Sequence, residues 1–190
     1  LSILPIEKAA APAKVYIPLQ QHIGAPAKCI VAVGDEVKLG QKIGEAQGFV
    51  SSNIHSSVSG VVKAIELCGV PNGTAMCVVI ENDFKEEPHE SVKPHGDIAD
   101  LSKEEIVGIV KEAGIVGMGG ATFPNHVKIS PPPDSKAEYV ILNGAECEPY
   151  LNSDNRLMLE NPKSIVEGIK IIKKILNVPN VYVGIEDNKP

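Results

Sequence analysis

The sequence of 190 residues contains no tryptophan, and aromatic residues make up only 4% of it. Proteins that bind single-stranded nucleic acid use aromatic side chains as platforms on which the bases stack. The formal net charge is −6, which is the opposite sign to the one that attracts a phosphate backbone. The shortage of aromatic residues and the acidic balance both argue against a general nucleic-acid-binding protein.

The sequence also lacks the cysteine spacing of a metal site. The four cysteines are Cys29, Cys68, Cys77 and Cys147, and no two of them form a Cys-x-x-Cys pair. Zinc and iron–sulfur sites usually show such closely spaced ligands, so we expect no metal site within these residues. Scattered cysteines without a secretion signal are typical of reduced thiols in a reducing compartment.

A long apolar run is missing as well. A membrane-spanning helix needs about 20 consecutive apolar residues, and no stretch approaches that length. No signal peptide is recognisable, so we expect any membrane association to come through partner proteins. The chain begins at Leu1 rather than Met and stops at Pro190, directly after a strand-like run. We therefore expect a piece of a longer protein.

The first part of the chain has the pattern of an all-β domain. Residues 1–12 are rich in Pro and Ala, which predicts an irregular arm. Residues 13–83 consist of short Val- and Ile-rich runs separated by Gly-Asp, Gly-Gln and Asn-Gly turns. This layout resembles the barrel-sandwich hybrid fold of biotinyl and lipoyl carrier domains. Such carriers hold a modified lysine at an exposed hairpin tip, but the corresponding residues 48–53 include none. We therefore predict an unmodified structural or docking module.

Residues 84–100 combine two prolines and one glycine with many charges, which indicates a linker. His89 and His95 lie in this stretch, and we expect both to be solvated rather than metal ligands. His22 and His55, in the all-β part, also lack an evident partner in the sequence.

A helix is predicted after the linker. Ser102 and Glu105 have the spacing of a capping box, in which each side chain bonds to the other residue's backbone N–H. Apolar residues then follow on one helical face, and Gly114 ends the helix. That face comprises Ile106, Ile109, Val110 and Ala113.

The most unusual stretch follows directly. Residues 114–128 contain four glycines and end at Lys128. They match neither the P-loop, which needs Gly-Lys-Ser/Thr, nor the dinucleotide fingerprint Gly-x-Gly-x-x-Gly. Glycines nevertheless let backbone amides approach a ligand closely. Phe123 and Pro124 can start a short helix whose N-terminus favours an anion. The stretch predicts a site for a phosphorylated ligand, with a tight turn and a surface lysine as the alternative.

The remaining residues predict one strand–helix–strand unit. Residues 139–142 are short and continuously apolar, as in a buried parallel strand. Asn161 and Pro162 are a cap and first residue for a helix, and residues 181–185 form a second strand. The acidic run 143–150 leaves the first strand at its carboxyl end, where open α/β sheets bind their ligands.

The two motifs together resemble a known family. The first is Gly117-x-Gly119-Gly120-Ala121-x-Phe123-Pro124-x-x-x-Lys128, and the second is Asn143-x-x-Glu146-x-Glu148-Pro149. Their joint spacing is similar to that of the flavin- and NADH-binding subunit of respiratory complex I, and closer to that of the C subunit of the Rnf complex. The resemblance implies an α+β or α/β two-domain chain. The barrel-sandwich hybrid is followed, at residues 101–190, by the first part of a Rossmann-like FMN- and NADH-binding domain.

The resemblance assigns two sets of cofactor contacts. The residues expected to contact FMN are Gly117, Gly119, Lys128, Asn143 and Glu146. The residues expected to contact NADH are Gly120, Ala121, Phe123 and Glu148. Hydride transfer between two rings depends on their alignment, so we assign no catalytic acid or base.

Some positions leave alternatives open. Ala145 stands where the complex I subunit has an aspartate, which removes a polar contact to the flavin, and Cys147 replaces a serine. Glu146 and Glu148 would share one face if the chain stays extended, but they also fit a solvated loop. Asp154 and Arg156 fit either structural charges or the site.

The resemblance also implies a function. We expect an electron-input subunit that passes electrons between NAD(H), FMN and two 4Fe-4S clusters in a missing C-terminal region, so that this piece alone is inactive. The expected partners are the other Rnf-type membrane subunits and, indirectly, ferredoxin, at the cytoplasmic face of the membrane. The alternatives are a soluble, proline-reductase-associated protein similar to the Rnf C subunit and a non-catalytic scaffold with a vestigial flavin loop.

Overall fold

The computed structural model describes residues 4–71, 73–118 and 120–189. Its contacts divide the chain into two compact units. The first unit is Ala10–Lys128, and the second is Ile129–Pro190 together with Leu1–Ala9. The first unit therefore holds the glycine-rich stretch together with the β-rich residues.

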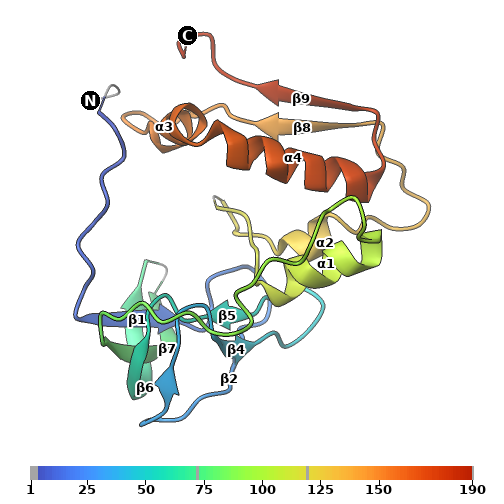
Figure 1. The fold of residues 1–190 in the computed structure, drawn as a ribbon. Coiled ribbons are helices and arrows are strands. Elements are labelled where there is room, and N and C mark those ends of the chain that lie inside the picture. The colour runs from blue at the N-terminus through green and yellow to red at the C-terminus, as the bar shows by residue number, and fades with distance from the viewer. Residues whose placement is uncertain (1–3, 72, 119, 190) are drawn as a thin grey trace. The chain divides into compact units, whose positions relative to one another are not determined.

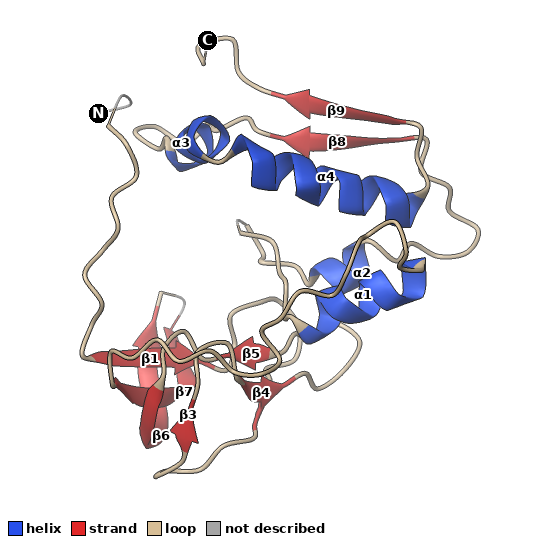
Figure 2. Ribbon diagram, viewed as in Figure 1, coloured by secondary structure: helices blue, strands red, loops and turns tan. Residues whose placement is uncertain are grey.

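The first unit contains two antiparallel sheets (Figure 2). One has the order β1 (Lys14–Pro18), β7 (Gly73–Asn82), β6 (Gly60–Val70) and β3 (Glu36–Val37). The other has the order β2 (Lys28–Cys29), β4 (Lys42–Glu45) and β5 (Ile54–His55). The expected all-β architecture of this part is therefore confirmed.

Apolar side chains from both sheets form the core of the first unit. Each strand directs alternate residues inward, and the buried ones are mostly β-branched, which suits a pleated surface. The fully buried members are Ile43, Val62, Val78 and Ile80, and Ile17, Leu19, Ala27, Val37 and Ile54 complete the cluster. This core supports the loops that carry the candidate site.

Residues 87–89, within the predicted linker, are hydrogen-bonded to the β-rich residues. Leu39 forms a parallel bridge with Pro88. The backbone N–H of Leu39 donates to Glu87 O at 2.9 Å, and that of His89 donates to Leu39 O at 2.9 Å. Since these bonds join two backbone segments, residues 87–89 behave as an added edge of the β structure.

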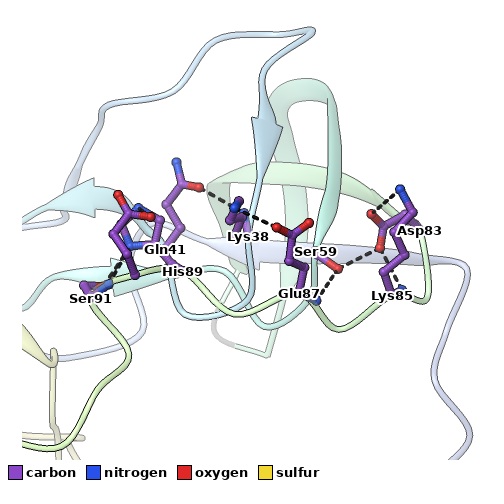
Figure 3. A network of polar contacts seen from close by, with 9 residues as sticks. Lys38, Gln41, Ser59, Asp83, Lys85, Glu87, His89 and Ser91 are labelled. Atoms are coloured by element: carbon purple, nitrogen blue, oxygen red, sulfur yellow. Dashed lines mark hydrogen bonds and ion pairs between the residues drawn. The ribbon is translucent and has the colours of Figure 1, made fainter.

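A row of polar side chains reinforces this edge (Figure 3). Ser59 Oγ donates to Asp83 at 2.7 Å and accepts from the backbone N–H of Glu87 at 3.1 Å. Lys38 pairs with Glu87 at 2.7 Å. His89, which we expected to be solvated, is partly exposed: its Nδ1 lies 2.9 Å from Ser91 Oγ and its side chain is 26% exposed.

Helix α1 (Lys103–Glu112) begins as the sequence predicts (Figure 1). Ser102 Oγ accepts from the backbone N–H of Glu105 at 3.2 Å, and the Glu105 carboxylate accepts from the backbone N–H of Ser102 at 2.8 Å. Ile106 and Val110 are buried. The helix ends at Gly114, whose φ is +65°. The bond from Ile115 N to Val110 O closes the Schellman motif that such a glycine permits.

The second unit contains one parallel strand pair and two helices. β8 (Tyr139–Asn143) pairs with β9 (Asn180–Gly184), and α3 (Ser153–Glu160) and α4 (Pro162–Leu176) lie between them in the chain. The strand–helix–strand prediction is confirmed. Helix α3 was not expected.

Two details of the second unit differ from the prediction. β8 was expected to be buried, but Tyr139 is 56% and Ile141 is 62% exposed. Among the described residues the sheet has two strands, so one face keeps its apolar side chains in solvent. Asn161 stands at the N-cap of α4 but makes no side-chain cap hydrogen bond. Its carbonyl accepts from Ser164 Oγ at 3.0 Å.

Within the described residues, the helices are too short or too polar to cross a lipid bilayer. No cluster of three His, Cys, Asp or Glu side chains in this part of the chain has the geometry of a metal site.

Candidate functional site

The glycine-rich stretch forms a narrow loop with two paired arms. Val116 and Pro124 make an antiparallel bridge. Gly117 N donates to Phe123 O at 2.9 Å, and Asn125 N donates to Ile115 O at 2.9 Å. Residues 118–122 form the tip; Gly119 lies outside the described residues. We call residues 115–125 the glycine loop.

The tip of the glycine loop is open to solvent. Met118 is 99% exposed. Gly120 has a φ of +56°, and a Cβ built on it would meet no atom within 4 Å. Thr122 also has a positive φ, at +48°. A glycine with left-handed backbone and free space above it is a place where a ligand can approach the main chain.

Helix α2 (Asn125–Lys128) follows the loop and is one turn long. Pro124 immediately precedes it, and Pro124 O accepts from both Val127 N at 3.2 Å and Lys128 N at 3.3 Å. A single turn has little macrodipole, and two of its N–H groups are already used. Its N-terminus is therefore a poor anion site. The positive charge comes from Lys128, which is exposed and pairs with no carboxylate among the described residues.

The β-rich part of the same unit contacts the glycine loop directly. The backbone N–H of Ile23 donates to Ala121 O at 3.1 Å. A cavity of about 580 Å³ lies beside this bond and is lined by residues 20–23 and 120–122, among others. The tip is thus fixed on one side and accessible on the other.

The two histidines that seemed unpartnered in the sequence have partners, so that expectation is wrong. His22 is 5% exposed, its Nε2 accepts from Ser52 N at 3.1 Å, and its Nδ1 lies 3.0 Å from Ile23 O. Burial lowers the pKa of His55, and Lys42 lowers it further, while the backbone and carboxylate of Glu112 act in the opposite direction. Apart from Ile23, these partners are distant in sequence, so the sequence near each histidine does not predict them.

In the second unit, the acidic run is anchored by its first carboxylate. Glu146 Oε1 accepts from Ser153 Oγ at 3.1 Å and from Asp154 N at 3.0 Å, at the start of α3. Burial raises the pKa of Glu146, but these hydrogen bonds, with one from Asn155 N, outweigh it and hold the pKa below its usual value. Asn143 Oδ1 accepts from Ala145 N at 3.1 Å.

Glu148 behaves differently from Glu146. It is exposed, and its carboxylate makes no hydrogen bond or ion pair with the residues that the structure describes. Cys147 is also exposed, and Tyr150 is 96% exposed with a φ of +68°. Glu148 is therefore the carboxylate of this run that is available to a ligand.

Arg156 has a structural contact. Its Nε donates to Glu160 at 2.8 Å, one helical turn away in α3. Glu160 also accepts from the backbone N–H of Ile6 at 3.0 Å. Asp154 stands in the first turn of α3, where an acidic residue suits the helix dipole.

The predicted site residues thus fall into two groups, one in each unit. The first unit holds Gly117, Gly120, Ala121, Phe123 and Lys128. The second unit holds Asn143, Glu146 and Glu148. The first group offers main-chain approach and the exposed Lys128 ammonium, which fits a phosphate. The second offers the Asn143 amide and the exposed Glu148 carboxylate, which fits polar groups on a ring or a sugar.

Sequence reasoning missed Ile23, which binds the tip of the glycine loop, and Asn53, whose Nδ2 lies 3.4 Å from Glu112 O at the end of α1. Ile23 acts through its main chain, which leaves no trace in the sequence. Asn53 lies in residues 48–53, whose notable feature in the sequence is the missing lysine.

Two family models match the chain. The RnfC barrel sandwich hybrid domain matches residues 2–85, and the Nuo51 FMN-binding domain matches residues 110–190. The second match begins at the end of α1 and includes both motifs of the candidate site.

Curated proteins match nearly the whole chain. The C subunit of the proton-translocating ferredoxin:NAD(+) oxidoreductase complex of Clostridium ljungdahlii is 54% identical over 98% of this chain and 41% of its own length. The C subunit of the Na(+)-translocating ferredoxin:NAD(+) oxidoreductase complex of Acetobacterium woodii is 47% identical over 98% and 42%, respectively. The C subunit of the ion-translocating oxidoreductase complex of Rhodobacter capsulatus is 43% identical over 97% and 36%. The chain spans about two fifths of the length of these relatives.

Proposed function

Because the chain belongs to the family of the Rnf complex C subunit, we propose that it forms part of the FMN- and NAD(H)-binding subunit of an ion-translocating ferredoxin:NAD oxidoreductase. The observation that carries the proposal is the open glycine loop with the exposed Lys128 beside it. Both lie within the residues matched by the FMN-binding domain model. The names of the relatives support the same reaction class.

The glycine loop and Lys128 are proposed to bind the FMN phosphate. By the resemblance, Gly117 and Gly119 would contact this ligand, and the Lys128 ammonium would supply the charge. When bound, FMN supplies the chemistry of hydride exchange with NAD(H) and of single-electron transfer.

The acidic run is proposed to contact the flavin and the nicotinamide away from the FMN phosphate. The Asn143 amide has donor capacity left for the flavin beyond its bond to Ala145 N. Glu146 is assigned to the FMN side, where it fixes the shape of the run through α3. Glu148 is proposed to face the nicotinamide, and the residues proposed to line the NADH path are Gly120, Ala121 and Phe123.

Several proposals concern the whole protein. The parallel β8–β9 pair would be the start of a Rossmann-like sheet, within a domain that begins near residue 101. Electrons would enter at FMN and continue to two 4Fe-4S clusters in polypeptide outside these residues, since the relatives are more than twice as long. The other subunits and ferredoxin would be the partners, with the protein peripheral to the cytoplasmic face of the membrane. The 190 residues alone would be inactive.

Titration of the full-length protein with FMN and with riboflavin tests this function. Riboflavin lacks the phosphate but keeps the ring. A charge-assisted phosphate contact of about 1.5–3 kcal/mol predicts FMN affinity roughly 10- to 100-fold above that of riboflavin. Flavin fluorescence reports both. Equal affinities would show that the glycine loop does not bind the phosphate. If neither flavin binds, the result would favour a non-catalytic scaffold.

A further inference from the structure

The loop between β4 and β5 has an exposed tip, where Phe49 is 78% exposed, and a buried end. Ser51, Ser52 and Asn53 are 0%, 1% and 5% exposed. Ser51 Oγ donates to Ala25 O at 2.8 Å and accepts from Gln47 N at 3.0 Å. Residues 46–53, which we call the socket loop, are therefore fixed by internal hydrogen bonds at their buried end, Ser51–Asn53.

The end of helix α1 lies on the socket loop. Asn53 Nδ2 is 3.4 Å from Glu112 O and 3.5 Å from Lys111 O. These carbonyls belong to the last turn of α1, where no further helical N–H is available to Glu112 O. The Asn53 Oδ1 atom meanwhile accepts from Ala46 N at 3.0 Å. One amide side chain thus joins the socket loop to the helix.

The fit around Gly114 is close. A Cβ on this residue would lie 2.3 Å from Asn53 O and 3.1 Å from the His55 ring. Lys42, on β4, also pairs with Glu112 at 2.9 Å. The point where α1 turns into the glycine loop is therefore held by β4, the socket loop and β5.

The tip of the glycine loop and helix α2, which follows it, also contact the β-rich residues. His126, in α2, is 9% exposed. A hydrogen bond with the backbone of Phe49, in the socket loop, opposes the lowering of its pKa by burial. Ile23 N binds Ala121 O at the tip. The β-rich residues therefore make contacts just before the glycine loop, at its tip and just beyond its end.

We propose that the socket loop positions the glycine loop for the FMN phosphate, and that Asn53 is the main positioning residue. This inference rests on the proposed function. Backbone amides bind a phosphate well only when their directions are set in advance, because ordering a free loop on binding would consume part of the binding energy. The buried end of the socket loop, Ser51–Asn53, is the part that provides this support.

Asn53→Asp in the full-length protein tests the proposal. The aspartate keeps the acceptor for Ala46 N but turns the donor toward Glu112 O into a second acceptor, which repels the carbonyl. We expect FMN affinity to fall at least tenfold. Hydrogen exchange of the glycine-loop amides in the FMN-free protein should accelerate by a similar factor.

Asn82→Asp is the matched control. Asn82 is also a buried amide, at 7% exposure; its Nδ2 donates to Pro12 O at 2.9 Å and its Oδ1 accepts from Phe84 N at 2.8 Å. It contacts no residue of the glycine loop in these bonds. We expect it to lower the melting temperature but to leave FMN affinity and loop exchange unchanged.

The outcomes separate the two claims. Loss of affinity in both variants, or in neither, would overturn the positioning role. If the unmodified protein binds no FMN, the proposed function fails, and hydrogen exchange still decides whether Asn53 orders the loop.

Discussion

The Glu146 carboxylate caps helix α3 through the backbone N–H of Asp154, at 3.0 Å. Ser153 Oγ adds a second bond at 3.1 Å to the same oxygen. A carboxylate at this place satisfies free N–H groups and suits the positive end of the helix dipole. The acidic run is therefore attached to α3 at Glu146, while Glu148, two residues on, is exposed.

Glu146→Gln should weaken this cap and lower the free energy of unfolding by about 1 kcal/mol near neutral pH. The pKa of Glu146 is lowered in the folded protein, so its contribution is complete above the ordinary glutamate pKa. The contribution disappears as pH falls through the lower, folded value. Urea denaturation of both proteins from pH 7 to pH 3 should show the difference shrinking. A difference independent of pH would show that the charge does not matter. Glu148→Gln, at an exposed position, is the control.

Gly114→Ala should destabilise the first unit. Its φ of +65° disfavours any side chain, and the new Cβ would collide with Asn53 O. We expect a loss of about 1–3 kcal/mol. Gly108→Ala is the comparison in the same helix, because its Cβ would meet nothing within 4 Å and alanine favours helix by about 1 kcal/mol. Chemical denaturation should move in opposite directions for the two variants. Equal effects would mean that Gly114 is not constrained by the socket loop.

Local signals in the sequence predicted the elements that depend on near neighbours. The capping box of Ser102 and Glu105 and the glycine end at Gly114 need only residues within one or two turns. Pro162 likewise begins α4. Short Val- and Ile-rich runs with glycine turns predicted the antiparallel sheets, because alternation and turn chemistry are also local.

Long-range partners could not be predicted in this way. His22 looked unpartnered until the fold brought Ser52 N to its ring, and Asn53 binds a helix end almost sixty residues away. The burial of β8 was overestimated, because an apolar run reports propensity and not how many strands cover it. Main-chain contacts such as Ile23 to Ala121 depend on no side chain at all.

Lys128→Ala should weaken FMN binding in the full-length protein by roughly 1.5–3 kcal/mol, since a phosphate contact is lost. Riboflavin has no phosphate, so its affinity should hardly change. The ratio of the two affinities, followed by flavin fluorescence, is the measurement. Lys103→Ala, at the start of α1, is the control. An unchanged ratio of FMN to riboflavin affinity would show that Lys128 does not contact the phosphate.

Glu148→Ala should leave FMN bound but impair NADH turnover, because this free carboxylate is assigned to the nicotinamide side. Steady-state kinetics with NADH and an artificial electron acceptor would measure the effect, with flavin content determined on the same sample. Full turnover with full flavin content would contradict the assignment. Loss of flavin from the variant would indicate that Glu148 contacts FMN and not the nicotinamide.

Acid should destabilise the first unit through His55 and His126. Burial lowers the pKa of both, Lys42 and Lys111 respectively lower them further, and Glu112 and the Phe49 backbone oppose the shifts. Below the ordinary histidine pKa of 6.5, the unfolded chain takes up protons that the folded protein does not. The free energy of unfolding therefore falls as pH drops from about 7 through 6.5, and levels off below the folded pKa values.

His126→Gln separates this effect from general acid sensitivity. It removes one of the two protonations, so stability should fall less steeply between pH 7.5 and pH 5, even if the variant is less stable throughout. His95→Gln, at an exposed position, controls for the loss of a histidine. Urea denaturation followed by circular dichroism gives the slope for each protein. If His126→Gln and the unmodified protein share one slope, protonation of His126 is not coupled to unfolding, and the contact between α2 and the socket loop does not depend on a neutral ring.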